Sequence, residues 1–598
     1  MKRPDVSRSK LARLLLLMLL SVTPCIVAVD RAAAEGQWTT LPYLMPINPI
    51  HMALMNNGKV LIIAGSGYEA RNTAYDAAVW DPQSGAIVRQ RLGWDMFCNG
   101  MVVLPDGRVF INGGNLRYNP FLGEPRSAIY DPATDRFTDV QNMAHGRWYP
   151  TATMLDDGSV MTFSGLSEIG LTNKAVEIYR VASGWSPEYD ADWTPPLYPW
   201  MHLLPNGRVF VSGSAPNSRL FDPNTQTWSV GAVTNFGRMR RYGSSVLLPL
   251  DPAAGYAARV MIFGGGDPAT ASTELIDLSA PTPQWRYGPP MSQARIEMNA
   301  TLLPNGRVLA LGGSAVDEDA TTASLNADLY DSDTNTFSSA GANAFPRLYH
   351  SNVLLLPDGT VAVVGGNPTQ GAYEPHIEIY SPAYLFNVDG RAATRPSIAS
   401  APATVTYGST FQVQTAEAAD IASVVLMRPG APTHAFDMDQ RLVRVSYSVG
   451  SGVLNVIAPP NGSVAPPGYY MLFVLNSAGV PSVARFVQLT ANFSLSATPA
   501  SQTVLPGDGA SYTATVSGGS GFADTVTFTV GGLPPGTTAS FTNPSVNGAG
   551  TTTLTVSTSL ATPLGTHQFV ITGDSRGVVQ RTSITLVVGP SMPSVGQR

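Results

Sequence analysis

The 598-residue sequence is poor in charge: only 13% of its residues are Asp, Glu, Lys or Arg, and its net charge is −6 at pH 7. Beyond the first residues it carries no basic run, which argues against a nucleic-acid partner. It also lacks any long segment with helical apolar spacing, whereas glycine (57) and proline (48) are abundant. This turn-rich pattern is typical of an all-β chain, and the length predicts roughly three or four domains.

The first 34 residues have the order of a secretory signal. Basic residues among the first 13 precede the apolar stretch Leu14 to Leu20, and Ala32-Ala33-Ala34 completes an A-x-A cleavage pattern. The alternative is an uncleaved membrane anchor, but the apolar run is shorter than the ~20 residues that a span needs. We therefore expect a secreted or extracytoplasmic protein with no membrane span in the mature chain.

Cysteine is nearly absent, and this scarcity is informative. If residues 1–34 are removed, Cys98 is the single cysteine left. It cannot form a disulfide within its own chain. Two interpretations remain: a buried small hydrophobe, or a thiol with a chemical role.

A repeated pattern predicts the fold of residues 35–390. An apolar strand, a turn of the Pro-Asp-Gly type and a second apolar strand end in glycine seven times, at intervals of 48 to 53 residues. The closing glycines are Gly65, Gly114, Gly165, Gly213, Gly265, Gly313 and Gly366. A period near 50 resembles the kelch repeat, so we expect a seven-bladed kelch-type β-propeller.

Aligning the turns places unusual residues at one position of the blade. Counting back eight residues from the one before the turn glycine gives Cys98, Tyr149, Tyr198, Glu297 and His350. Equivalent positions of a propeller surround its central channel, so we expect these side chains at one mouth of it.

Tyr349 precedes His350, and neighbouring strand residues point to opposite faces, so both reach one ion only if the backbone bends there. Phenolate and imidazole suit Cu(II). A second histidine must come from elsewhere, and His51 lies near the first inner strand. The other propeller histidines are expected to be surface or structural residues; they are His145, His202 and His376.

Two further all-β units follow the propeller. Residues 391–490 read as short alternating strands and predict an immunoglobulin-like β-sandwich, in which Thr433-His434 occupies a long loop that can reach away from its own domain. Residues 491–598 alternate Ser, Thr, Gly and Val and predict an additional immunoglobulin-like domain, in which we expect His567 to be structural. This last unit suits attachment to a surface polysaccharide.

Over about residues 40–490 the chain resembles the galactose oxidase and glyoxal oxidase family of copper-radical oxidases. The resemblance is carried by five short motifs: Phe97-Cys98, Arg147-Trp148-Tyr149-Pro150-Thr151, Tyr349-His350-Ser351, Thr433-His434 with Asp439-Gln440-Arg441, and Pro466-Pro467-Gly468-Tyr469-Tyr470. The Arg-Trp-Tyr-Pro-Thr form is closer to glyoxal oxidase.

The resemblance implies copper and a radical cofactor made by a thioether bond between Cys98 and Tyr149. It implies Tyr149, Tyr349, His350 and His434 as copper ligands, with Tyr349 also acting as the base that takes the substrate's proton. Galactose oxidase stacks a tryptophan on its radical tyrosine, but the matching place here, Leu166-Ser167-Glu168, has none. Trp148 or Trp94 could cover the ring instead.

The implied reaction oxidises a small aldehyde or primary alcohol with O2 and releases hydrogen peroxide. Such an oxidation removes two electrons, and copper accepts one, so a second one-electron acceptor must lie beside it. We expect a monomer. The alternative function is a non-catalytic secreted kelch propeller that binds glycan or protein.

Overall fold

The computed structural model describes residues 35–519 and 522–589. The expected signal at residues 1–34 lies outside this part of the chain. Within the described ranges, no helix is both long and apolar enough to cross a membrane. Strands dominate, and four short 3-10 helices interrupt them: η1 (Pro252–Ala254), η2 (Ala320–Thr322), η3 (Ala383–Leu385) and η4 (Ala418–Asp420).

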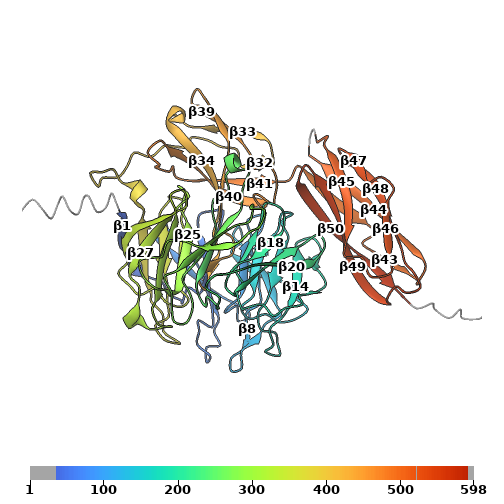
Figure 1. Ribbon diagram of the computed structural model, residues 1–598, viewed down its shortest axis with the longest axis horizontal. Coiled ribbons are helices and arrows are strands. Elements are labelled where there is room, and N and C mark those ends of the chain that lie inside the picture. Colours follow the sequence, from blue (N-terminus) through green and yellow to red (C-terminus); the bar gives the residue numbers. More distant parts are fainter. Residues whose placement is uncertain (1–34, 520–521, 590–598) are drawn as a thin grey trace, which may run out of the picture.

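Seven antiparallel sheets of four or five strands make up the first part of the molecule (Figure 1). Each runs outward from a short inner strand, and the seven sheets are consistent with the seven predicted blades. Their strands are β2 (His51–Leu54), β3 (Val60–Gly65), β4 (Asp76–Trp80) and β5 (Ile87–Arg91); β6 (Gly100–Val103), β7 (Val109–Asn112), β10 (Ser127–Asp131) and β11 (Arg136–Val140); β12 (Thr151–Met154), β13 (Val160–Phe163), β14 (Ala175–Arg180), β15 (Gly184–Trp185) and β16 (Tyr189–Asp190); β17 (Met201–Leu203), β18 (Val209–Val211), β19 (Asn217–Asp222) and β20 (Thr227–Val233); β21 (Ser244–Leu247), β22 (Arg259–Phe263), β23 (Thr273–Asp277) and β24 (Trp285–Tyr287); β25 (Ile296–Leu302), β26 (Val308–Ser314), β27 (Asn326–Asp331) and β28 (Thr336–Ala342); and β29 (Asn352–Leu355), β30 (Val361–Val364), β31 (His376–Ser381) and β1 (Gln37–Leu44).

The propeller is closed by its own N-terminal strand. β1 pairs antiparallel with β31 of the last blade, with Trp38 opposite Tyr380, so the last sheet contains strands from both ends of the propeller sequence. The two rings pack 4.8 Å apart. This pairing closes the ring of blades, an arrangement that leaves only short sheet edges for another chain to pair with.

The Pro-Asp-Gly turns explain why the inner hairpins recur. In the second blade, the backbone N–H of Gly107 donates to Leu104, and Gly107 has φ +88°, where a side chain would be strained. The carboxylate of Asp106 accepts from the backbone of Arg108 at 3.1 Å. Glycine and aspartate are therefore the residues that this turn requires.

Four of the blades each contain one buried arginine that forms an ion pair within its own sheet. Arg147, Arg240, Arg295 and Arg347 precede an inner strand, and each is ion-paired with an acidic side chain on the third strand of its own sheet. The pairs are Arg147–Glu177 at 2.8 Å, Arg240–Glu274 at 2.9 Å, Arg295–Asp328 at 2.8 Å and Arg347–Glu378 at 2.7 Å. Buried charges need such partners, and the pairs fix the loop that leads into each inner strand.

A central sandwich covers one face of the propeller (Figure 1). It joins the sheet β32-β41-β40-β34-β37 to the sheet β33-β39-β38, and a small β35-β36 hairpin projects from it. Its strands are β32 (Thr404–Thr406), β33 (Thr410–Gln414), β34 (Ile421–Arg428), β35 (Pro432–Thr433), β36 (Phe436–Asp437), β37 (Arg441–Arg444), β38 (Tyr447–Gly450), β39 (Val453–Ile457), β40 (Gly468–Asn476) and β41 (Arg485–Thr490).

A last sandwich pairs the sheet β42-β44-β48-β46 with the sheet β43-β50-β49-β45-β47. Its strands are β42 (Phe493–Thr498), β43 (Ser501–Val504), β44 (Gly509–Gly518), β45 (Thr525–Gly531), β46 (Thr538–Phe541), β47 (Ser545–Asn547), β48 (Gly550–Ser557), β49 (Gly565–Ser575) and β50 (Val578–Val588). Arg581 of β50 is buried against Asp156 and Asp157 of the propeller, and it also donates to Asn224. The last sandwich is thus docked on the propeller through a buried ion pair.

Candidate metal centre

The backbone turns left-handed where each unusual residue enters an inner strand. Cys98, Tyr149, Tyr198, Glu297 and His350 all have positive φ, between 45° and 70°. Residues other than glycine rarely adopt this conformation, and it persists only where the surrounding fold enforces it. It confirms the bend that Tyr349 and His350 need, since both rings come to lie on the same side, 3.9 Å apart.

Tyr242 occupies the same position in the fifth blade, with φ 48°, and the sequence analysis missed it. That blade replaces Pro-Asp-Gly by a longer turn that ends at Gly255, so counting back eight residues from it does not reach Tyr242. A different signal was present: Arg240-Arg241-Tyr242 repeats the Arg-x-Tyr spacing of Arg147–Tyr149 and Arg347–Tyr349.

The structure brings the five predicted site residues together. Cys98, His350 and His434 offer ligand atoms that all lie within 4.8 Å of one another. The thiol of Cys98 is 3.4 Å from Nε2 of His434, and the hydroxyls of Tyr149 and Tyr349 are in direct contact. All five side chains are buried, at most 6% exposed.

His434 reaches this position on the β35-β36 hairpin, which the central sandwich inserts into the propeller. Three consecutive residues behind the hairpin each bond to the inner strand of a different blade: Asp439 accepts from Val103, Gln440 from Leu302, and Arg441 donates to Leu203. At the tip, Thr433 donates to the carbonyl of Ile50 at 2.9 Å. The Asp439-Gln440-Arg441 motif therefore positions the histidine.

Hydrogen bonds at the outer nitrogens set the tautomers of both histidines. Nδ1 of His350 lies 2.6 Å from the amide oxygen of Asn367, which can only accept, so this nitrogen carries the proton. Nδ1 of His434 lies 2.6 Å from Oγ1 of Thr433, whose own proton goes to Ile50. Both Nε2 atoms are therefore free of protons and turned toward the site, and Nε2 of His350 has no hydrogen-bond partner among the described residues.

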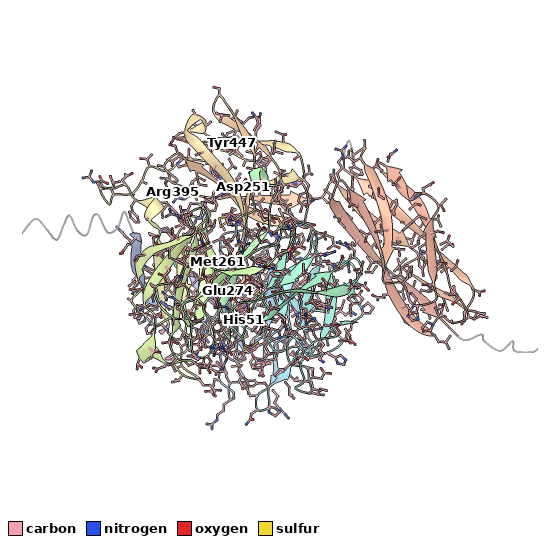
Figure 2. All side chains as sticks on the ribbon, in the orientation of Figure 1. His51, Asp251, Met261, Glu274, Arg395 and Tyr447 are labelled. Carbon is pink, nitrogen blue, oxygen red and sulfur yellow. The ribbon has the colours of Figure 1, made fainter. Side chains whose placement is uncertain are left out.

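His51 lies beside the site, but its Nε2 already accepts a hydrogen bond from the backbone and is not free to bind a metal. It lies near the centre of the propeller (Figure 2), 5.8 Å from the ring of His434, and its Nε2 accepts from the backbone of Asn99 at 3.3 Å. The remaining propeller histidines are structural or exposed: His202 lies buried in β17 against Ser245, and His145 and His376 pair with nearby glutamates at the surface.

Burial controls the protonation of the site. It raises the pKa of the Tyr149 and Tyr349 phenols and of the Cys98 thiol well above their usual values, because a charge would be desolvated there. It lowers the pKa of His350 to about 3. The site thus holds neutral imidazoles at ordinary pH, and only a nearby cation would favour a phenolate.

A cavity of ≈ 250 Å³ opens beside these residues. Tyr149, Tyr242 and His434 line it, and its walls are largely apolar. The other lining residues are Pro196, Leu197, Tyr198, Trp200, Ser214, Met239, Arg240 and Arg241. The cavity has room for a small molecule that contacts the candidate centre directly.

Comparison with known proteins identifies the family. The glyoxal oxidase N-terminus model matches residues 67–384, just over half of the chain, and the galactose oxidase-like early set domain model matches residues 395–489. The chain belongs to the glyoxal oxidase and galactose oxidase family of copper-radical oxidases.

Its relatives in this family include plant and fungal enzymes. Aldehyde oxidase GLOX from Vitis pseudoreticulata is 31% identical over 461 residues, which are 69% of this chain and 85% of that protein. Galactose oxidase from Gibberella zeae is 28% identical over 492 residues, 75% and 69% of the two chains. The solved structure of a fungal alcohol oxidase in complex with copper matches with 25% identity and a TM-score of 0.67, covering 76% of this chain and all of that one.

This family member covers Tyr149 with Trp148. The two rings stack 3.8 Å apart at 15°, and Phe121 from the β8 (Asn115–Arg117) to β9 (Leu122–Gly123) hairpin stacks on the far side of Trp148 at 4.1 Å. The other candidate, Trp94, instead donates to Asp139 at 3.0 Å. The residue before the tyrosine thus takes the place of a tryptophan from the following loop.

Proposed function

We propose that this enzyme is a copper-radical oxidase that oxidises a small aldehyde or primary alcohol with O2 and releases hydrogen peroxide. One observation carries the proposal: two buried imidazoles with proton-free Nε2 atoms converge on two buried phenols and a thiol. Family membership supports an enzyme and argues against the non-catalytic binding propeller.

The donor set fits copper. Two imidazole nitrogens and two phenol oxygens are the N,O environment that Cu(II) prefers, and the unpartnered Nε2 of His350 and the direct contact of the Tyr149 and Tyr349 hydroxyls both call for a cation between these groups. We propose His350, His434, Tyr149 and Tyr349 as its ligands. Bound there, copper would supply one of the two one-electron acceptors that the reaction needs and would acidify a coordinated hydroxyl.

Tyr149 would be the second electron acceptor after joining Cys98. The thiol lies 3.4 Å from Nε2 of His434, whose ring is 4.7 Å from the ring of Tyr149, and the backbone N–H of Tyr149 donates to the carbonyl of Cys98. Forming the thioether replaces the S–H bond and one ring C–H bond by an S–C bond, and the two electrons and two protons leave to O2 as hydrogen peroxide. The Trp148 ring then shields the modified phenol from water.

Tyr349 would take the hydroxyl proton of the substrate. Its hydroxyl contacts those of Tyr149 and Tyr242, which both line the cavity, so a substrate that binds beside these two phenols would lie close to it. The small volume of the cavity favours short substrates over bulky sugars.

Intact mass and peroxide release test the proposal. The copper-loaded enzyme is expected to be lighter than its sequence by two hydrogen atoms, with one copper per chain. Cys98→Ser is expected to keep the fold and the copper, to show no such loss, and to lose peroxide release with methylglyoxal. Absence of both copper and the mass loss in the unmodified enzyme would refute the oxidase function, and equal peroxide rates for both forms would refute the radical role of Cys98.

We further propose an exported monomer whose last sandwich attaches to a surface polysaccharide. The support is the signal pattern at residues 1–34 and the Ser- and Thr-rich strands of a domain that lies beyond both family matches. Retention of the full-length enzyme on insoluble cell-wall polysaccharide, compared with a chain ending at residue 490, measures the attachment.

A further inference from the structure

Tyr242 is a third phenol at the candidate centre, and neither the sequence pattern nor the proposed ligand set uses it. Its hydroxyl lies 3.4 Å from that of Tyr349, and the two rings are 5.0 Å apart at 51°. A separation of 3.4 Å is long for an O–H···O hydrogen bond. Arg241 also hydrogen-bonds the Tyr242 side chain, and a guanidinium can only donate. The O–H of Tyr242 can therefore exchange its long bond to Tyr349 for a closer acceptor while it keeps the bond from Arg241.

The side chain of Tyr242 is held in place by Arg241, which also lines the cavity. The guanidinium of Arg241 lies 4.9 Å from the ring centroid and is ion-paired at 3.0 Å with Asp317 from the loop of the neighbouring blade. On the other side of the chain, Arg240 is buried against Glu274. Tyr242 thus presents its hydroxyl from a fixed position, which is what recognition of a small molecule requires.

A molecule in the cavity contacts Tyr242 and two of the proposed copper ligands together. Tyr149, His434 and Tyr242 line the cavity together, while Leu197, Trp200 and Met239 give it apolar walls. The hydroxyl of Tyr198, another lining residue, is already used, since it donates to the carbonyl of Asn99 at 2.8 Å. Among the lining phenols outside the proposed ligand set, Tyr242 is therefore the one that a bound substrate can engage.

The two substrate classes of the proposed function differ in their need for such a group. A primary alcohol has one hydroxyl on its reacting carbon, whereas the hydrate of an aldehyde has two. Once one oxygen of the hydrate occupies the reactive position, the second hydroxyl needs a hydrogen-bond partner in the cavity. Without one, it loses its hydrogen bonds to water and gains none from the protein. The conversion RCH(OH)2 + O2 → RCOOH + H2O2 removes one C–H and one O–H hydrogen and leaves the second oxygen in the product.

We infer that Tyr242 binds the second hydroxyl of an aldehyde hydrate and so makes this enzyme select aldehyde hydrates over primary alcohols. The inference rests on the proposed oxidase function and names the substrate class that this function takes. Tyr242 is a specificity-determining residue in this assignment, with Arg241 and Asp317 as the residues that position it.

The test compares propanal, which is hydrated in water, with 1-propanol. Tyr242→Phe is expected to lower kcat/KM for propanal about threefold to tenfold more than kcat/KM for 1-propanol, the effect of one neutral hydrogen bond. Tyr198→Phe is the matched control: it removes a phenol hydroxyl from the same cavity wall and is expected to keep the ratio of the two substrates.

A binding measurement separates recognition from turnover. Acetate presents two oxygens on one carbon, as the hydrate does, whereas azide binds through a single nitrogen. In titrations followed by the absorption of the copper-loaded enzyme, Tyr242→Phe is expected to weaken acetate by a similar factor and to leave azide unchanged.

Two failures are distinguishable. If Tyr242→Phe loses activity toward both substrates equally, or if Tyr198→Phe shifts the ratio as much, the assignment of Tyr242 is overturned while the oxidase function stands. If the unmodified enzyme neither binds copper nor releases peroxide from either substrate, the proposed function falls and the assignment falls with it.

Discussion

Replacing Asn367 with alanine is expected to weaken copper binding, although Asn367 is not a proposed ligand and acts only through His350. The amide oxygen of Asn367 accepts from Nδ1 of His350 at 2.6 Å and is itself held by the amide of Asn48 at 3.2 Å. This bond selects the tautomer that leaves Nε2 free and fixes the plane of the ring. Alanine keeps the backbone N–H that donates to the carbonyl of Tyr349 but also loses the bond from the Asn367 amide to the carbonyl of Ala372 in the same loop.

The size of the effect follows from what the bond does. Loss of a partner that orients a metal-binding histidine lowers metal affinity by about 10- to 100-fold, or about 1.4–2.7 kcal/mol. The substitution also leaves a buried N–H unpaired, since His350 is 1% exposed, which costs about 1–3 kcal/mol of the free energy of unfolding. Copper affinity and apoprotein stability are therefore both expected to fall.

A matched variant separates the two effects. Asn115 also follows a Gly-Gly pair and is buried, but its amide donates to Asp95 at 2.9 Å and contacts none of the proposed ligands. Asn115→Ala is expected to lower the apoprotein melting temperature without changing copper affinity, measured by competition with a chelator. Unchanged affinity in Asn367→Ala, or an equal loss in Asn115→Ala, would refute the reasoning.

Two further predictions concern the stacked ring and the docked domain. Trp148→Leu removes the ring 3.8 Å from Tyr149 and is expected to shorten the lifetime of the radical absorption several-fold, while the mass loss from the thioether persists. Phe121→Leu changes the ring on the outer side of Trp148 and is expected to have a smaller effect in the same spectroscopic assay. A larger effect of Phe121→Leu than of Trp148→Leu would contradict the stacking argument. Arg581→Met removes one partner of a buried ion pair and is expected to lower the free energy of unfolding, measured by chemical denaturation, by about 3–5 kcal/mol. The control Arg576→Met, at an exposed ion pair, is expected to lower it by about 0–1 kcal/mol. Equal losses would mean that the buried pair does not hold the last sandwich on the propeller. Burial raises the pKa of Asp157, but Arg581 and the other nearby groups outweigh burial and hold this pKa at about 2, below the unfolded value of about 3.9. The ionised Asp157 therefore stabilises the fold above about pH 4, and this stabilisation is lost as the pH falls toward 2. Arg581→Met is expected to move the onset of acid unfolding to higher pH.

The sequence predicted the repeated parts of the molecule and failed where the repeat is broken. Gly107 and its counterparts mark turns that only a few residue types can make, so the blades and the positions of Cys98, Tyr149 and His350 followed from counting. Tyr242 was missed because its blade has no such turn. The Arg-x-Tyr spacing that it shares with Arg147–Tyr149 was the signal that counting from the turns did not use.

Side-chain direction was the other limit. A Gly-Gly-Asn sequence reads as a turn, and nothing in it tells that Asn367 points at His350 whereas Asn115 points at Asp95. The choice between Trp148 and Trp94 likewise depended on where two rings point. The roles of the site residues as ligands and base stay predictions, although the structure brings all of them together.

The centre is assembled from separate parts of the fold, and bonds away from the proposed ligands hold these parts together. Asp439 bonds to the backbone of Val103 at 2.6 Å and to the buried Arg428 at 2.8 Å, and Arg428 returns a bond to the carbonyl of Val103 at 2.6 Å. These bonds lie behind the hairpin, away from the imidazole of His434. Because they fix the hairpin before any ion binds, copper would meet a preformed set of donors, and its binding energy would go into the centre rather than into folding the chain. Removing copper is therefore expected to leave the docking of the central sandwich unchanged, which distinguishes this site from one that its metal folds.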